Sequence, residues 1–281
     1  MIQDIRQSIL FTKYMRLLGW ETEKIDSNYI YKRKFPLIGY FAKMPRPNMP
    51  IDLDKIKVYK QSNKIFRLKI SPLVDQSDQK YQQYQKKFIR SGFKIDHDTF
   101  NPTTNYLVDL TPEENEIFNN FSEAKRRAVR RAIKNGVFIK ESNDLDSFIK
   151  IRQRQYLPVW FLVGGEMKSL WKIFYPQNAS ILLAYHPKNM NAIAGILLLF
   201  YKKQAYYWFA SALSSGKKLF APTLLVWEAL KLSKKRGCTI FDFEGIYDER
   251  FPKASASWKG FTKFKEGFGV RKIIYLENFY L

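Results

Sequence analysis

The stretch from residue 205 to residue 269 constrains the fold most, because its hydrophobic pattern changes period twice. Residues 205–210 form an aromatic run that is typical of a buried strand. From Thr223 to Lys235, apolar residues recur at helical spacing, and Gly237 is placed to end that helix. Residues 239–243 then alternate as a second strand. This order predicts an α/β unit in the second half of the chain.

The loop before the expected helix bears on which acyl donor such a unit could hold. A strand, a helix and a strand in this order are typical of the centre of a GNAT-type acyltransferase fold, where two neighbouring strands splay apart and leave a slot for the donor. A GNAT that binds coenzyme A has a glycine-rich loop there, and backbone N–H groups hold the pyrophosphate. Here residues 213–222 contain Gly216 alone, with two lysines and with Pro222 at the helix start. The sequence therefore disfavours coenzyme A.

Charge and composition restrict the class of protein and its partners. The 281 residues carry 48 Lys and Arg against 26 Asp and Glu, a net charge of +22. This excess predicts a polyanionic partner, namely tRNA, a nucleotide-linked substrate or an anionic membrane surface met peripherally, with a solvated surface as the alternative. Two histidines and one cysteine make a zinc site improbable, and no apolar run of membrane-spanning length is present. We expect a cytoplasmic, metal-free protein.

The pattern of helices and strands repeats once along the chain. The first half predicts a helix at 4–18 and strands at 29–33, 37–42, 65–70 and 105–110. A long helix is then expected from Thr111, which can serve as its N-cap, to Lys134. The second half predicts helices at 143–155 and 164–174 and strands at 181–185 and 192–200, before the unit described above. Two α/β domains that join near the long helix are therefore predicted.

A set of short motifs occurs in a fixed order along nearly the whole chain. It comprises Gln7-Ser8 with Phe11 to Lys13 and Gly19-Trp20, Val108 to Leu110, Ile193 to Gly195, Tyr206 to Ser211, Phe241 to Gly245, and Phe264-Lys265-x-x-Phe268-Gly269. In this order the motifs resemble the Fem aminoacyltransferases, the FemA, FemB and FemX enzymes that form peptidoglycan bridges. No heptad region long enough for the coiled-coil arm of FemA and FemB is present, so the chain is more similar to the armless FemX type.

The resemblance implies both a fold and a reaction. It implies two GNAT-like domains with mixed sheets, one of residues 1–113 completed by about 272–281 and one of residues 114–271. The implied reaction moves an amino acid from its ester on tRNA to an amine of a peptidoglycan precursor stem peptide. The acceptor would be UDP-linked or lipid-linked, with the armless type favouring the soluble UDP-linked form. No metal or coenzyme is implied, and a monomer is expected.

The same resemblance assigns the reacting groups. Lys265 is expected in a glycine-bounded loop, where its cation would meet the tetrahedral intermediate or the tRNA end. Phe264 would help to hold the reacting group through its backbone, and Asp109 would accept a proton from the incoming amine. Each has a structural alternative: a surface lysine, a core phenylalanine and an aspartate that ends a strand.

Acceptor contacts are implied at four positions. Lys13 matches a lysine that contacts the acceptor diphosphate, and Tyr207 matches a tyrosine of the substrate cleft. Phe209 stands where a second tyrosine is common, so the hydroxyl is lost. Lys168 lies where the family has an arginine, and a lysine gives a point charge rather than a bidentate fork.

A run of cations marks the end of the expected long helix. Arg126, Arg127, Arg130, Arg131 and Lys134 are predicted to form a basic face that contacts tRNA or phosphate. Val129, Ala132 and Ile133 are expected to face the core. Two other functions remain open from the residues alone: a GNAT-like N-acyltransferase that uses an acyl-CoA, and a non-catalytic RNA-binding module.

Overall fold

The computed structural model describes residues 4–98, 100–155 and 164–281, and its internal contacts divide the chain into two compact units. Unit 1 comprises Met1–Asn105, Gly245–Lys259 and Lys272–Leu281. Unit 2 comprises Tyr106–Glu244 and Gly260–Arg271. The end of the chain thus completes the unit with which the chain begins.

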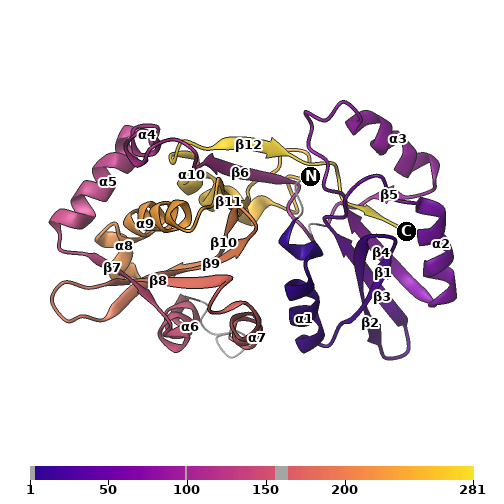
Figure 1. Cartoon of the computed structure of the whole chain (residues 1–281), viewed down its shortest axis with the longest axis horizontal. Helices are drawn as coiled ribbons and strands as arrows, with labels where there is room; N and C mark the ends of the chain where they lie inside the picture. Colours follow the sequence, from indigo (N-terminus) through magenta and orange to yellow (C-terminus); the bar gives the residue numbers. More distant parts are fainter. Residues whose placement is uncertain (1–3, 99, 156–163) are drawn as a thin grey trace. The chain divides into compact units, whose positions relative to one another are not determined.

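Unit 1 is built on a six-stranded mixed sheet of the described residues (Figure 1), with the strand order β1-β2-β3-β4-β13-β5. Its strands are β1 (Glu21–Ile25), β2 (Asn28–Phe35), β3 (Gly39–Pro45), β4 (Ile65–Ser71), β5 (Lys94–Ile95) and β13 (Phe279–Tyr280). Its helices are the 3₁₀ turns η1 (Ile5–Gln7) and η3 (Ala256–Trp258) together with α1 (Ile9–Leu17), α2 (Leu53–Ser62) and α3 (Tyr81–Arg90). Strand β13 pairs antiparallel with both β4 and β5, so the last residues lie inside the sheet.

The core of unit 1 lies between this sheet and helices α2 and α3. Ile56 and Phe88 from the helices are fully buried with Leu68 and Ile70 of β4. The rings of Phe88 and Phe279 stack with centroids 4.3 Å apart. The C-terminal strand therefore contributes to the core of unit 1 as well as to its sheet.

Unit 2 carries a seven-stranded sheet, counted over the described residues, with the order β12-β6-β11-β10-β9-β8-β7. Its strands are β6 (Thr104–Asp109), β7 (Phe138–Ser142), β8 (Ala179–Tyr185), β9 (Ala192–Tyr201), β10 (Gln204–Ala212), β11 (Ile240–Gly245) and β12 (Arg271–Ile274). Its helices are α4 (Glu114–Asn119), α5 (Glu123–Lys134), α6 (Leu145–Gln155), α7 (Gly165–Phe174), α8 (Ser214–Lys218), α9 (Ala221–Lys235) and α10 (Lys259–Glu266). Helices α5 and α9 lie on one side of strands β8–β10 and α6 and α7 on the other (Figure 1).

Strands β10 and β11 separate after a short parallel pairing. They pair from Gln204 to Tyr206 against Ile240 to Asp242, whereas β10 continues beside β9 as far as Ala212. The β9–β10 register shifts between Tyr207 and Phe209, and such a bulge bends a strand. The structure thus confirms an α/β fold with mixed sheets, and it contains the splay that the sequence order predicted.

The structure corrects three expectations about helices. The helix expected from Thr111 to Lys134 is two helices, because Ser122 accepts a hydrogen bond from the N–H of Lys125 and caps a new start. The expected loop at 213–222 contains α8 and the start of α9, and Lys265 lies in α10 rather than in a loop. These differences come from tertiary contacts, such as the bond from the N–H of Ser122 to the carbonyl of Gly267 at 2.9 Å.

Candidate functional site

Lys265 is a buried cation beside the splayed strands. It lies in the last turn of α10 and only 8% of its surface is exposed. Its Nζ lies 5.9 Å from the centroid of the Tyr207 ring. Tyr207 is the first residue of β10 beyond the pairing with β11. The lysine expected at the acyl-transfer site is therefore next to the strand separation.

Two carboxylates of β11 oppose the cost of burying this cation. Burial lowers the pKa of Lys265 to about 8, and the negative charges of Glu244 and Asp242 counteract this change. Asp242 is almost fully buried and accepts hydrogen bonds from Gln204 Nε2 at 3.3 Å and from the N–H of Glu244 at 2.6 Å. A pKa of about 8 leaves Lys265 mainly protonated at pH 7, so it acts there as a cation.

An aromatic wall surrounds the lysine. The ring of Tyr207 lies 5.4 Å from that of Phe243, which lies 5.6 Å from Phe268, and Phe264 lies 5.3 Å from Phe268. Burial raises the pKa of the Tyr207 hydroxyl, so this group stays neutral. Charge interactions are stronger in such an environment than in water.

A second desolvated lysine lies on the same wall. The Nζ of Lys125 lies 4.0 Å above the Phe264 ring and 4.7 Å from the Phe268 ring, a cation–π geometry. Burial lowers its pKa to about 8. A Cβ at Gly267 would lie 2.8 Å from Lys125 Cγ, so the glycine makes room for this side chain. Lys125 directly precedes the cationic run of the sequence, but no local signal joined it to Phe264.

Asp109, which was expected to accept a proton from the incoming amine, lies away from Lys265. It ends β6, where its carboxylate accepts hydrogen bonds from the N–H and hydroxyl of Thr111 at 2.9 and 2.7 Å. These bonds hold its pKa below the usual range. The neighbouring Leu110 bonds to Thr239, just before β11 begins, whereas Lys265 faces residues at the other end of that strand.

An arginine does reach the splayed part of β10, from a helix that the sequence did not single out. Arg152 of α6 lies 4.7 Å above the Phe209 ring, and its Nη1 donates to Ser211 Oγ at 3.4 Å and to the Ala210 carbonyl at 3.5 Å. Lys168, where an arginine was sought, is exposed on α7, and Lys13 is exposed on α1 of unit 1. Arg152 reaches Phe209 only because α6 packs against β10. No sequence motif predicts this packing.

The cations of α5 divide into structural and exposed groups. Arg126 Nη1 donates to the carbonyl of Asn119 at 2.7 Å and also to that of Phe121, so it caps the end of α4. Arg127 pairs with Glu123 at 3.3 Å on the helix surface. Arg130, Arg131 and Lys134 are exposed. Ile133, expected in the core, is 58% exposed, because the helix buries only Val129 and Ala132.

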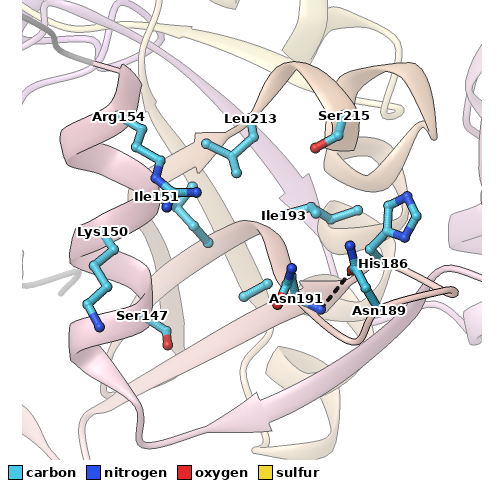
Figure 2. A pocket seen from close by; sticks show the side chains of 11 residues that line it. Ser147, Lys150, Ile151, Arg154, His186, Asn189, Asn191, Ile193, Leu213 and Ser215 are labelled. Carbon is cyan, nitrogen blue, oxygen red and sulfur yellow. Dashed lines mark hydrogen bonds between the residues drawn. The ribbon is translucent and has the colours of Figure 1, made fainter.

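A cavity of about 400 Å³ lies at the end of the sheet where β10 leads into α8 (Figure 2). Lys150 and Arg154 of α6, His186 of the β8–β9 turn and Ser215 of α8 are among its lining residues, and none of the described lining residues carries a carboxylate. A Cβ at Gly216 would lie 2.6 Å from the Ile193 carbonyl oxygen. The single glycine of this segment therefore serves close packing of α8 on β9, which further weakens the expectation of a pyrophosphate loop.

The fold is GNAT-like, and three solved structures resemble it. A tandem GNAT protein from the clavulanic acid biosynthesis pathway matches with a TM-score of 0.57 at 7% identity, covering 90% of this chain and 78% of that one. The C-terminal domain of a putative lysylphosphatidylglycerol synthetase from Agrobacterium fabrum matches with a TM-score of 0.61 at 12% identity, covering 98% and 87%. The crystal structure of FemX matches with a TM-score of 0.79 at 16% identity, covering 99% and 92%.

A comparison of the sequence with models of protein families also finds a match. Residues 177–280 match the FemAB family, and this segment contains β10, β11 and α10. The predicted resemblance to the Fem family is thereby confirmed. A comparison with curated protein sequences gives no match.

Two further observations concern metals and membranes. Among the described residues, no group of three or more His, Cys, Asp or Glu side chains is arranged to hold a metal ion. No helix in the described part of the chain is long and apolar enough to cross a bilayer.

Proposed function

We propose that this protein transfers an aminoacyl group from aminoacyl-tRNA to an amine of a peptidoglycan precursor stem peptide. The observation that carries the proposal is the buried Lys265 beside the splay of β10 and β11, within a segment that matches the FemAB family. The reaction is acyl transfer, for which a GNAT-like fold supplies a slot between two strands.

The chemistry needs a neutral amine and a stabilised oxyanion. The amine nitrogen attacks the ester carbonyl, the ester C–O bond breaks, and the amine proton leaves with the ribose oxygen. The Lys265 ammonium would stabilise the negative charge that develops on the carbonyl oxygen, an effect that is large in a dry site. The aromatic wall of Tyr207, Phe243 and Phe268 would exclude water that could otherwise hydrolyse the ester.

The donor RNA would be held through its phosphates. The exposed cations Arg127, Arg130, Arg131 and Lys134 and the basic cavity of Figure 2 all belong to unit 2, as does Lys265. Arg126 is excluded from this role because its guanidinium is already used to cap α4. The remaining candidates supply positive charge without requiring a base-specific contact.

Only the GNAT-like fold supports the alternative in which the donor is an acyl-CoA. The segment that would bind its pyrophosphate has only Gly216, which is committed to contact with Ile193. No observation on the described residues favours this donor over an RNA-linked one, so we propose no second function.

The test is incubation of the protein with a mixed pool of charged tRNAs and UDP-linked pentapeptide, followed by mass measurement of the pentapeptide. We expect an added amino-acid residue, and we expect Lys265→Met to lower the rate about 100-fold or more while tRNA binding persists. Lys263→Met is the matched control, because Lys263 lies on the same helix but is exposed. No added mass with any charged tRNA, or equal losses in the two variants, would refute the proposal.

A further inference from the structure

The turn between β2 and β3 exposes a run of apolar residues. All six residues from Arg33 to Ile38, which we call the hairpin tip, are exposed. Leu37 is 108% exposed, Ile38 63% and Phe35 39%, and Phe66 of the adjacent β4 is 43% exposed. The rings of Phe35 and Phe66 lie 6.3 Å apart, edge to face. Contiguous apolar exposure of this kind marks an interaction site rather than chance.

The backbone conformation of the tip does not favour these apolar residues. Leu37 has φ +67°, a left-handed conformation that favours glycine, asparagine or aspartate. A leucine at this position is conformationally strained. It gains no hydrophobic stabilisation in return, because its side chain is fully exposed to solvent. Folding therefore gives no reason for the sequence Phe-Pro-Leu-Ile at this turn.

Cations accompany the apolar residues. Arg33 and Lys34 belong to the tip, and the backbone of Lys64 lies beside Gly39, which follows the tip, since a Cβ at Gly39 would be 3.0 Å from the Lys64 carbonyl oxygen. All three are exposed, and none forms an ion pair within the described residues. The acidic residues nearest in the sheet, Glu21 and Glu23, are engaged by Lys32 at 3.6 and 2.6 Å.

We propose that the hairpin tip inserts Phe35, Leu37 and Ile38 into the surface of an anionic lipid bilayer, with Arg33, Lys34 and Lys64 on the lipid phosphates. Apolar side chains beside cations, all at one turn, provide the two signals that reversible membrane binding requires. The core of a protein interface is depleted of charged residues, whereas this tip carries Arg33 and Lys34 directly beside its apolar side chains. The net charge of +22 favours the same surface.

Membrane docking bears on the acceptor of the proposed reaction. If the acceptor is a lipid-linked precursor, the tip would bring the protein to the surface where that precursor lies. This consequence rests on the proposed function, but membrane binding does not, because it is measured without tRNA or acceptor. Failure of one is therefore distinguishable from failure of the other.

The experiment is co-sedimentation of the full chain with vesicles of phosphatidylcholine alone or mixed with phosphatidylglycerol. We expect binding to the anionic vesicles that weakens with salt. Arg33→Gln with Lys34→Gln should weaken it about fivefold for each cation removed. Leu37→Asn with Ile38→Ser should weaken it about tenfold or more while thermal stability is kept or increased, because asparagine suits the left-handed position.

Val58→Ser is the matched control, since Val58 is 62% exposed on α2 of the same unit but outside the tip, and the change adds no charge. It should leave vesicle binding unchanged. The proposal is overturned if the protein does not bind anionic vesicles, or if the tip and control variants weaken binding equally. It is also overturned if the tip variants instead abolish a dimer detected by light scattering, which would make the tip a contact between copies.

Discussion

At the residue scale, the candidate site contains two lysines that folding largely removes from water. Lys265 and Lys125 lie on α10 and α5, and both contact the same aromatic wall, Lys125 through Phe264 and Phe268 and Lys265 through Tyr207. Burial disfavours the charged form of a lysine, which is why the pKa of each falls to about 8. Only Lys265 has carboxylates nearby that raise its pKa again. The charged form of Lys265 is thus stabilised by neighbouring carboxylates, whereas that of Lys125 is not.

These pKa values predict how stability changes with pH. Above about pH 8 the unfolded chain keeps protons that the folded protein releases, so the free energy of unfolding should rise from about pH 8 to pH 9.5, by at most about 1.4 kcal/mol per pH unit for each lysine. Below pH 8 both lysines are charged in the folded protein, and burying these charges lowers the free energy of unfolding by its full amount. Lys125→Met should be as stable as the wild type or more stable at pH 7, with a shallower rise. Urea unfolding at several pH values measures this, and an unchanged slope would contradict it.

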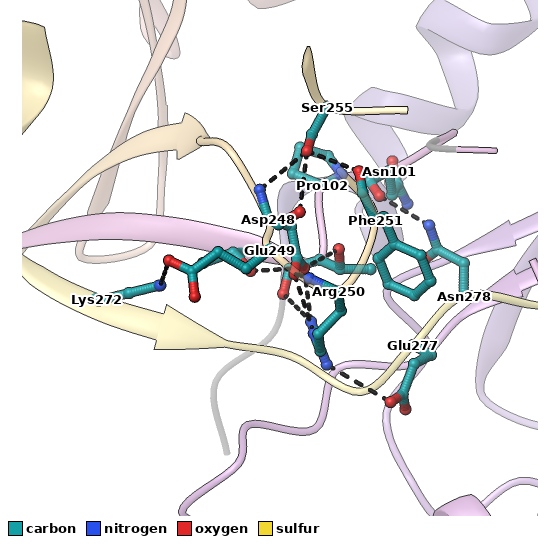
Figure 3. Close-up of polar contacts among 12 residues, drawn as sticks. Asn101, Pro102, Asp248, Glu249, Arg250, Phe251, Ser255, Lys272, Glu277 and Asn278 are labelled. Atoms are coloured by element: carbon teal, nitrogen blue, oxygen red, sulfur yellow. Dashed lines mark hydrogen bonds and ion pairs between the residues drawn. The ribbon is translucent and has the colours of Figure 1, made fainter. Parts of the chain in front are cut away.

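At the element scale, a polar network joins segments of unit 1 that are distant in sequence (Figure 3). Asp248, after β11, accepts hydrogen bonds from the hydroxyls of Thr103 and Thr104 at 2.6 and 2.7 Å. Arg250 pairs with Asp248 at 2.8 Å and with Glu277 at 3.6 Å, and it donates to the Tyr81 hydroxyl at 3.1 Å. The network therefore connects α3, the start of β6 and the C-terminal segment.

Acid should weaken this network. Burial would raise the pKa of Asp248, but hydrogen bonds from Arg250, Thr103 and Thr104 outweigh it and lower the pKa to about 2. Because the folded pKa is depressed, this stabilisation is complete above about pH 4 and is lost as pH falls towards 2, at a cost of about 2 kcal/mol. Asp248→Asn should destabilise the protein at pH 7 and less so at pH 2. Thermal unfolding across this range checks it, and a constant difference between the proteins would contradict the assignment.

At the scale of the whole molecule, the excess positive charge governs binding to polyanions. The net charge of +22 is spread over both units, so many surfaces could attract RNA weakly. What distinguishes α5 is that its cations gather on one helix. A screened, sequence-independent attraction of this kind depends steeply on salt.

The predicted contribution of α5 is measurable as a salt slope. The logarithm of the binding constant falls by about 0.7 per phosphate contact on single strands and about 0.9 on B-form DNA for each tenfold rise in salt, and we expect tRNA to lie in this range. Arg127→Gln with Arg131→Gln should therefore reduce the slope of tRNA binding by about 1.5. Lys86→Gln with Arg90→Gln removes the same charge from exposed positions on α3 and should change it little. Equal changes in both variants would show that net charge alone, and not α5, determines binding.

The sequence by itself determined those features that depend on local pattern. Period and turn residues predicted the strand, helix and strand now seen as β10, α9 and β11, and the motif around Lys265 contributed to the resemblance to the FemAB family. The net positive charge of the chain follows directly from the sequence, as does the presence of only one glycine in residues 213–222. Each of these follows from neighbours within about one turn of helix or one strand.

Tertiary structure alone decided which side chains meet. Lys125 and Arg152 joined the site region, and Asp109 was excluded from it, through the packing of α5, α6 and β6. The long helix divides at Ser122, whose N–H bonds to the carbonyl of Gly267, and Lys265 lies on α10 rather than in a loop. Burial lowers the pKa of both lysines, and the charges of Glu244 and Asp242 act on Lys265. The partners of Lys125 and Ser122, Phe264 and Gly267, lie more than a hundred positions away, and no local pattern records them.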